Sequence, residues 1–367
     1  MHPTSSVARP TFVHDHPLRV YWEVTRACDL ACRHCRATAN PWADPGELTT
    51  LDGLRLLQRL AAFGEPLPHI VLTGGDPLKR CDLLALVAAA RALDFRVSVA
   101  PSATPLLTTD ALLALKTAGI DAMSLSLDGS TVERHDAIRG ISGTYGRTLE
   151  AARIANVLHV AFQVNTLVCA DTVDDLPAIY ERVKALGAAR WSLFFLVTVG
   201  RGRVLEPVSA ERAEQVLEWA AGLHGHPGEA APIVTTTEAP QLRRVVMQVR
   251  WSRGDAEVPT RGNGHAHHAA GVRDGNGIMF ISHTGDICPS GFLEIAAGNV
   301  RTDDVVEVYR SAPLFQQLRD VDGFQGRCGR CEYRSVCGGS RARAFGATGN
   351  PLAADPLCEY EPEAGRL

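Results

Sequence analysis

Three cysteines lie within eight residues near the start of the chain, namely Cys28, Cys32 and Cys35. Three thiolates on one short loop can bind three irons of a four-iron cluster, whose usual protein ligands are four cysteines. The remaining iron would keep a free coordination position, to which an external molecule could bind. The spacing leaves one alternative open, a structural zinc site in which His34 supplies the fourth ligand.

A second group of cysteines lies near the other end of the chain. Cys328, Cys331 and Cys337 are followed by Cys358, twenty-one residues later. Four thiolates can close a four-iron cluster completely, which suits electron transfer or a structural role rather than ligand binding. A zinc ion held by the same four cysteines is the alternative.

Further residues that could bind a cofactor follow or end β-rich segments. These candidates are Gly74, Gly75, Asp76, Ser126, Arg139 and Asn165. Taken one at a time, each has an ordinary explanation: a glycine-rich turn, a hydrogen-bonded polar residue of a strand, or a surface ion pair. The last applies to Arg139, which follows Asp136 by nearly one helical turn.

Six β-rich segments alternate with amphipathic, helix-length segments between residue 20 and about residue 225. The predicted strands are Val20–Thr25, His69–Thr73, Arg96–Ala100, Ala122–Leu127, Val160–Val168 and Arg190–Val197. The predicted helices are Leu51–Leu60, Leu83–Leu93, Ala111–Ala118, Leu149–Val157, Leu176–Leu186 and Ala210–Leu223. This alternation predicts an α/β fold with a parallel sheet and right-handed crossovers. Six units are too few for a closed eight-fold barrel, so we expect a partial (β/α)6 TIM-like barrel with its chemistry at the carboxyl ends of the strands.

The composition divides the chain into four parts. We expect an N-terminal extension at residues 1–17, the barrel at 18–225, a linker or flexible loop region at 226–277 and a small C-terminal iron–sulfur domain at 278–367. In the last part, Ile278–Ser282 and Asp286–Pro289 predict a β-hairpin. The loop region contains His265, His267 and His268, which are either solvated on a glycine-rich loop or part of a substrate loop.

The order of these motifs along one β/α array resembles the radical SAM superfamily, in the branch that carries a C-terminal SPASM or twitch domain. The resemblance covers roughly residues 18–360. It implies a [4Fe–4S] cluster that binds S-adenosylmethionine (SAM) and is held by Cys28, Cys32 and Cys35. It also implies SAM contacts from Gly74, Gly75 and Asp76 at the amino group, Ser126 at the ribose, Arg139 at the carboxylate, Asn165 on the fifth strand and His34 near the adenine. Asp76 stands where the family usually has Glu, and His34 where it usually has an aromatic residue.

The same resemblance assigns a role to the C-terminal cysteines. It implies two [4Fe–4S] clusters in total, the second being an auxiliary cluster held by Cys328, Cys331, Cys337 and Cys358. A further auxiliary cluster would need cysteines near Arg341 and after Gly298, and both are missing. Cys288 is then left over as a free buried thiol, a replacement ligand or a hydrogen-atom donor facing the substrate. Cys81 and Cys169 are expected to be buried structural thiols.

The resemblance also implies the chemistry. One electron cleaves SAM to methionine and a 5′-deoxyadenosyl radical, which takes a hydrogen atom from the substrate. The segments around the first cysteines and after the sixth strand resemble enzymes of haem and haem d1 formation and decarboxylases of antibiotic pathways. We therefore expect a lyase such as a decarboxylase, or an oxidoreductase, that acts on a small carboxylated metabolite. This metabolite is either a sugar acid of a nucleoside pathway or a porphyrin side chain. Arg201 and Arg203 either hold this carboxylate or form a solvated turn.

Two other functions stay open. A ribosomal-peptide maturase is one, although only about 18 residues precede the first predicted strand, where such enzymes often carry a peptide-recognition domain. The other is a non-catalytic iron–sulfur protein of electron transfer, which would need the cysteines but no SAM-binding residues.

The composition excludes several classes of partner. With 37 basic and 41 acidic residues, the formal net charge of −4 lacks the basic excess of a nucleic-acid-binding surface. We find neither a membrane-spanning stretch nor a secretory signal and expect a cytoplasmic protein. Ten cysteines in that compartment indicate metal or redox chemistry rather than disulfides. Besides its substrate, the enzyme should need an external one-electron donor of the flavodoxin or ferredoxin type.

Overall fold

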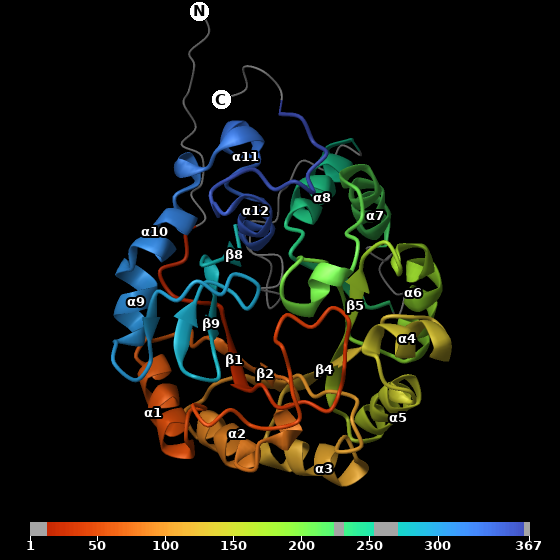
Figure 1. The fold of residues 1–367 in the computed structure, drawn as a ribbon, viewed down its shortest axis with the longest axis vertical. Coiled ribbons are helices and arrows are strands. Elements are labelled where there is room, and N and C mark those ends of the chain that lie inside the picture. Colours follow the sequence, from red (N-terminus) through yellow and green to blue (C-terminus); the bar gives the residue numbers. More distant parts are fainter. Residues whose placement is uncertain (1–12, 224–230, 253–270, 363–367) are drawn as a thin grey trace, which may run out of the picture.

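The computed structural model describes residues 13–223, 231–252 and 271–362. A sheet of mostly parallel strands forms the centre of the molecule, and helices cover its outer face (Figure 1). Seven parallel strands follow one another in chain order: β1 (Arg19–Thr25), β2 (His69–Gly74), β3 (Val97–Val99), β4 (Ala122–Ser126), β5 (Ala161–Val168), β6 (Arg190–Phe195) and β7 (Ile233–Thr237). The first six lie where the sequence predicts strands. The partial barrel is thus confirmed, with one strand more than expected.

Helices on the outer face connect these strands. They are α1 (Thr50–Ala61), α2 (Leu83–Ala92), α3 (Thr109–Ala118), α4 (Val132–Arg139), α5 (Thr144–Val157), α6 (Leu176–Ala185) and α7 (Ala210–Gly222). The alternation of side chains along each strand separates the helix-facing core from the barrel interior. On β1, Val20, Trp22 and Val24 are fully buried in the core under the helices. Arg19 and Tyr21 line the interior cavity instead.

The sequence assigns residues 226–277 to a linker, but residues 231–252 of this segment fold. β7 pairs in parallel with β6, and α8 (Gln241–Ser252) packs against α7. The strand was missed because only Val234 is buried, and the three threonines that follow it give no apolar alternation. The motif with His265, His267 and His268 lies outside the described residues, so its interpretations stay predictions.

The C-terminal part of the chain is built onto the free edge of β1. β9 (Gly277–Ile281) pairs in parallel with β1 and forms the predicted hairpin with β10 (Asp286–Cys288). β8 (Arg273–Asp274) and β11 (Gly298–Asn299) complete the sheet. The helices that follow are α9 (Val305–Ser311), α10 (Pro313–Arg319), α11 (Gly326–Arg330) and α12 (Arg341–Thr348). The C-terminal hairpin therefore continues the barrel sheet rather than starting a separate one.

Two local features differ from the prediction. α4 was not expected because its sequence is polar, and its buried side chains are only His135 and Ile138. α5 begins at Thr144 rather than Leu149, since its first turn lacks an apolar repeat. Short 3₁₀ turns are η1 (Pro77–Lys79), η2 (Val173–Asp175), η3 (Gly200–Val204) and η5 (Val321–Gly323). Within the described ranges, no helix has the length and apolar character needed to cross a membrane.

Candidate active site

The first cysteine loop follows β1, at the carboxyl end of the parallel strands, as predicted. Cys28 and Cys32 are buried and Cys35 is half-buried. The backbone N–H of Leu30 donates to Cys28 Sγ at 3.4 Å, the kind of hydrogen bond that tunes cluster sulfurs. Burial raises the pKa of the Cys28 and Cys32 thiols. Because a thiolate there needs a neighbouring cation, the loop fits cluster iron.

Two glycine-containing loops press against the backbone of the cysteine loop. A Cβ on Gly75 would lie 2.4 Å from the carbonyl oxygen of Ala27. From η3, Gly200 has a φ of +52°, and a Cβ there would lie 2.1 Å from the carbonyl oxygen of Arg36. No side chain fits at either position. In the structure Gly74 lets the backbone approach Thr25 and Gly75 lets it approach Ala27. The predicted approach of both glycines to a ligand stays a prediction.

Asp76 is fully buried, and its carboxylate is occupied within the protein. One oxygen accepts a hydrogen bond from Thr104 Oγ1 at 2.7 Å. The other accepts from the N–H groups of Ser102 at 3.3 Å and Leu78 at 3.2 Å. The carboxylate therefore holds the turn after β2. The expected contact with the amino group of SAM would therefore have to come from the backbone of this motif, and it stays a prediction.

Arg139, at the end of α4, lies beside the cysteine loop. Its Nη2 is 2.5 Å from Asp128 Oδ2, and its Nη1 is 3.8 Å from Cys32 Sγ. Burial opposes the charge of Arg139, but the Asp128 carboxylate raises its pKa above the ordinary value. Asp136 instead accepts hydrogen bonds from the start of α5. The surface ion pair that the spacing allowed is thus excluded.

Several buried polar atoms in this region have no hydrogen-bond partner among the described residues. They include Nε of Arg139, Nδ1 of His34 and Nη2 of Arg201. Burial and the charge of Arg139 lower the pKa of His34 to about 4, so its imidazole is neutral near pH 7. Buried polar atoms without partners are costly unless a ligand or water satisfies them. Their place next to Cys32 fits a polar ligand such as SAM.

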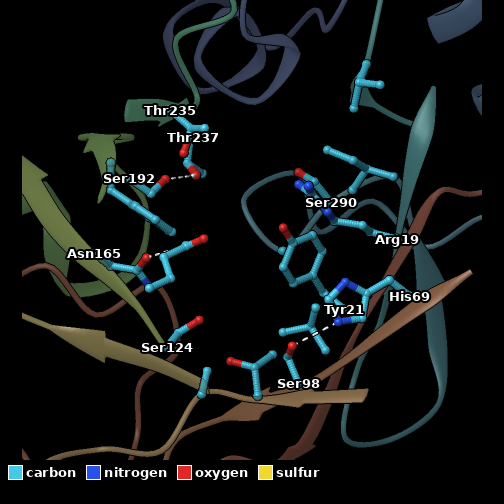
Figure 2. A pocket seen from close by; sticks show the side chains of 18 of the residues that line it. Arg19, Tyr21, His69, Ser98, Ser124, Asn165, Ser192, Thr235, Thr237 and Ser290 are labelled. Carbon is cyan, nitrogen blue, oxygen red and sulfur yellow. Dashed lines mark hydrogen bonds between the residues drawn. The ribbon is translucent and has the colours of Figure 1, made fainter. Parts of the chain in front are cut away.

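Ser126 and Asn165 are direct neighbours on β4 and β5. Asn165 faces the barrel cavity, where its Oδ1 accepts a hydrogen bond from Gln163 Nε2 at 2.6 Å (Figure 2). Ser124 faces the same cavity from β4, although the sequence did not single it out. The structure therefore brings two of the predicted SAM residues together near the carboxyl ends of neighbouring strands.

Arg201 contacts the cysteine loop, a role that the sequence did not predict. Its Nε donates to the carbonyl oxygen of Cys32 at 3.0 Å, and its Nη1 donates to that of Ala39 at 3.3 Å. Its backbone N–H donates to the carbonyl oxygen of Cys35 at 2.9 Å. Arg201 thus braces the cysteine loop, and Arg203 is exposed. Binding of a substrate carboxylate by this pair stays a prediction, because Nη2 of Arg201 has no partner among the described residues.

A cavity of about 470 Å³ occupies the barrel interior, within the size range of small-molecule sites. Figure 2 shows hydroxyl and amide side chains from several strands around it. The polar lining residues include Tyr21, Ser98, Ser124, Gln163, Asn165, Ser192, Thr235 and Thr237. The cationic ones are Arg19, Arg36, Arg96, Arg190, Arg243 and Arg273. Polar and apolar side chains both line this interior cavity, unlike the packed apolar core of a closed barrel.

Glu238, directly after β7, is a lining residue that the sequence reasoning missed. Its φ of +58° is uncommon for a residue with a side chain. Its carboxyl group faces Asp274 and accepts a hydrogen bond from Ser340 Oγ at 2.5 Å. Burial and the neighbouring Asp274 raise the pKa of Glu238 well above its ordinary value, which favours its neutral form. Only the fold brings these residues from distant parts of the chain together.

The C-terminal cysteines line one small pocket, as their spacing predicts: Cys328, Cys331, Cys337 and Cys358. The N–H of Gly339 donates to Cys337 Sγ at 3.4 Å, and that of Asp355 to Cys328 Sγ at 3.5 Å. The fully buried Arg341 also donates to Cys328 Sγ, at 3.5 Å. These contacts fit a cluster with four thiolate ligands. In the part of the chain that the structure describes, no three His, Cys, Asp or Glu side chains converge as ligands of one metal ion.

The remaining cysteines lie apart from both sets. Cys288 is 3% exposed on β10, and burial raises its pKa to about 12. It is not among the residues that line the barrel cavity or the four-cysteine pocket. Cys169 is buried as predicted. Cys81 is exposed, contrary to the prediction, because it stands in the surface turn before α2.

Comparisons with known proteins agree with this geometry. The family model described as Radical SAM superfamily matches residues 22–183. The chain is 37% identical to the AdoMet-dependent heme synthase of Oleidesulfovibrio alaskensis, over 94% of this chain and 87% of that protein. It is 30% identical to the pre-heme d1 synthase of Dinoroseobacter shibae, over 92% of this chain and 85% of that protein. It is also 30% identical to the Fe-coproporphyrin III synthase of Methanosarcina barkeri, over 96% of this chain and 90% of that protein.

A solved structure shows the same fold over nearly the whole chain. SuiB of Streptococcus suis, bound to the precursor peptide SuiA, superposes with a TM-score of 0.71. The match covers 95% of this chain and 77% of that one at 16% identity, a level at which the likeness concerns the fold alone. The relatives that match over most of their length show the family as well as the fold. Because the cysteine loop, the partial barrel and these relatives agree, the chain belongs to the radical SAM superfamily, whose members use a [4Fe–4S] cluster and SAM.

Proposed function

We propose that this radical SAM enzyme removes a carboxyl group from a side chain of a porphyrin. The observation that carries the proposal is full-length similarity to enzymes named for making haem, pre-haem d1 and Fe-coproporphyrin III. The barrel cavity supports it, because its hydroxyl, amide and guanidinium groups suit a carboxylated ligand.

Different residues at the carboxyl end of the barrel would bind the cluster and SAM. Cys28, Cys32 and Cys35 would bind the cluster, while Arg139 would bind the carboxylate of SAM. When bound, the cluster and SAM supply a 5′-deoxyadenosyl radical that takes a hydrogen atom from the substrate. The braced cysteine loop fixes where this radical arises. The enclosed cavity limits the side reactions that water and loose positioning would allow.

Decarboxylation also needs an acceptor for one electron. Removal of a hydrogen atom and CO₂ from a saturated side-chain carboxylate yields an alkene only if one further electron leaves the substrate. The pocket of Cys328, Cys331, Cys337 and Cys358 is where this chain would hold an auxiliary [4Fe–4S] cluster as an electron carrier. An external donor of the flavodoxin or ferredoxin type would supply the electron that starts each SAM cleavage.

Glu238 would help to position the substrate. Its carboxyl group lines the cavity, and the raised pKa favours the neutral form, which can donate a hydrogen bond without adding a charge. We expect Glu238→Gln, which keeps a hydrogen-bond donor, to retain most of the substrate affinity. Glu238→Ala should lose about tenfold, the value of one hydrogen bond to a charged group.

The proposal is tested by incubating the anaerobically reconstituted enzyme with SAM, a reductant and porphyrins that carry propionate side chains. Mass spectrometry should show loss of CO₂ and two hydrogen atoms from the porphyrin, together with 5′-deoxyadenosine. The Cys28→Ala variant is the control for SAM-independent decay. Cleavage of SAM with every porphyrin unchanged would contradict the proposal.

The same assay distinguishes another carboxylated substrate and two other functions from this proposal. Conversion of a nucleoside sugar acid instead of a porphyrin would identify the other carboxylated substrate. A peptide maturase is favoured only by the fold of SuiB, and conversion of a precursor peptide would identify it. A protein that binds iron but no SAM would be an electron-transfer protein, which the unpaired atoms of Arg139 and His34 disfavour.

A further inference from the structure

A carboxylate that the proposed function does not use is buried beside the first cysteine loop. Glu23 lies on β1, two residues before the end of the strand, and none of its side chain is exposed. Unlike Tyr21 on the same strand, it is not among the residues that line the barrel cavity. Burying a carboxylate is costly unless it is paired and hydrogen-bonded, so the partners of Glu23 indicate its role.

Two arginines that flank the cysteines bind this carboxylate. Arg36 directly follows Cys35, and its Nη2 lies 2.8 Å from Glu23 Oε1. Arg26 precedes Cys28 by two residues, and its Nε lies 3.1 Å from Glu23 Oε2. The carboxylate therefore ties the two ends of the cysteine loop to each other and to β1.

The C-terminal hairpin, which extends the sheet beside β1 (Figure 1), closes over the same carboxylate. His283, in the turn between β9 and β10, places Nδ1 2.9 Å from Glu23 Oε2, and its backbone N–H donates to this oxygen at 3.4 Å. After β10, Glu294 contacts both arginines, at 2.7 Å from Arg36 Nη1 and 3.2 Å from Arg26 Nη2. Two carboxylates and two guanidinium groups thus form one network between the cysteine loop and the hairpin.

The network carries fixed charges close to a cluster ligand. Burial opposes the charge of Glu23, but Arg36 and His283 lower its pKa to about 2, so it is ionised at neutral pH. Burial also opposes the charge of Arg36, yet the carboxylates of Glu23 and Glu294 and the thiolate of Cys35 raise its pKa above the ordinary value. The charges of the network therefore interact with a cysteine that would bind the cluster.

We infer that Glu23 is a positioning residue of the SAM cluster, whose negative charge offsets the two arginines beside the cysteine ligands and keeps the reduction potential of the cluster low. Reduction adds one electron to the cluster, and a neighbouring cation stabilises this added charge, whereas a neighbouring anion opposes it. A low potential is needed because the reduced cluster must give its electron to SAM. The inference rests on the placement of the cluster in this loop and not on the porphyrin substrate.

The test is a potentiometric titration of the anaerobically reconstituted enzyme, followed by electron paramagnetic resonance. The cluster whose signal changes on addition of SAM is the one measured. Glu23→Gln should increase the ratio of reduced to oxidised cluster at a fixed potential by about tenfold, an upward shift of about 59 mV for one electron. Arg36→Gln should shift the potential downward, because it removes a cation. A structural defect alone would not give shifts of opposite sign.

A milder variant covers the case in which Glu23→Gln does not hold its cluster. Glu294 is 40% exposed and contacts the same two arginines, so Glu294→Gln should fold and shift the potential upward by a smaller amount, since solvent screens its charge. The matched control is Glu150→Gln, which removes an exposed carboxylate paired with Arg153 on α5 and should leave the potential unchanged. Unchanged potentials in Glu294→Gln and Arg36→Gln, or shifts of the same sign, would refute the role of Glu23.

Assaying the same samples for porphyrin conversion separates this inference from the proposed function. Shifts of opposite sign, with no porphyrin converted by the wild type, would support the role of Glu23 and refute the decarboxylation. Conversion of porphyrin with unshifted potentials in the variants would do the reverse. A wild type without any cluster that responds to SAM would refute both.

Discussion

The two cysteine sites of this chain differ in their number of thiols and in what lies around them. Beside the loop of Cys28, Cys32 and Cys35, polar atoms of Arg139 and His34 have no partner among the described residues. In the C-terminal pocket, backbone N–H groups and a buried arginine donate to the sulfurs, but Gln241 Oε1 and Arg244 Nε there have no partner either. Unpaired polar atoms therefore occur at both sites and do not distinguish them. The number of thiols does, because three leave one iron of a four-iron cluster free for SAM, whereas four can close the cluster.

The two sites also differ in what holds them. Packing of the Gly75 and Gly200 loops against the backbone fixes the first loop. An arginine donates to a sulfur at both sites, Arg139 to Cys32 and Arg341 to Cys328. Loss of metal should therefore leave a cation beside protonated thiols at either site, while the glycine packing keeps the first loop largely in place. The following variants are ordered from the largest expected effect to the smallest.

The largest effect should come from replacing Cys28, Cys32 and Cys35 together by Ala. Without these ligands SAM cleavage should be abolished, and about half of the iron should be lost, since a second cluster remains. Iron analysis and chromatography of 5′-deoxyadenosine measure both. Residual SAM cleavage would show that the SAM cluster lies elsewhere.

The corresponding variant of the second cysteine site is Cys337→Ala in the C-terminal pocket. We expect it to lose the auxiliary iron and most of the porphyrin product while SAM cleavage continues, because the first site keeps all its ligands. Measuring iron, zinc, 5′-deoxyadenosine and product on one sample separates these effects. Zinc in the wild-type pocket, with only about four irons in total, would refute the auxiliary cluster and spare the radical chemistry.

A third variant, Gly200→Ala, tests the packing of the first loop. Its Cβ would meet a carbonyl oxygen at 2.1 Å, at a φ of +52° that alanine avoids. The strain should cost about 1–3 kcal/mol and reduce iron at the first site only. Gly146→Ala is the matched control, because a Cβ there meets nothing within 4 Å and the residue lies inside α5. That control should leave iron unchanged and stabilise the protein by up to about 1 kcal/mol.

A smaller effect is expected for Arg139→Ala. Loss of a charge-assisted hydrogen bond to the SAM carboxylate should weaken SAM binding by about 10-fold or more while the iron content stays the same. Equilibrium dialysis with labelled SAM measures the affinity. An unchanged affinity would mean that Arg139 serves only its ion pair with Asp128.

Much of the fold and the grouping of the cysteines could be predicted because the signals are local. Each of the first six strands has a β-rich run followed by an amphipathic helix, and each cysteine set has ligands close in sequence. β7 could not be predicted, since its stability comes from pairing with β6 rather than from its own apolar pattern. The polar helix α4, which ends at Arg139, was missed for the same reason.

The roles of several side chains could not be predicted because their partners are distant in sequence. Arg201 braces the carbonyl of Cys32 across 169 residues. Burial and the neighbouring Asp274 raise the pKa of Glu238.

The smallest effect is expected for Cys288→Ala, which tests whether the two sites account for all the cluster ligands. Cys288 is buried on β10, and burial raises its pKa to about 12, so it stays a neutral thiol. A buried neutral thiol behaves as a small hydrophobic group, and its removal should cost about 1 kcal/mol while iron and product stay the same. Loss of iron would instead make Cys288 a ligand, and Cys358→Ala would then retain its cluster. Unchanged iron with less product would make it a hydrogen-atom donor, although it does not line the cavity. Iron content and product yield measured on both variants therefore decide among the three roles.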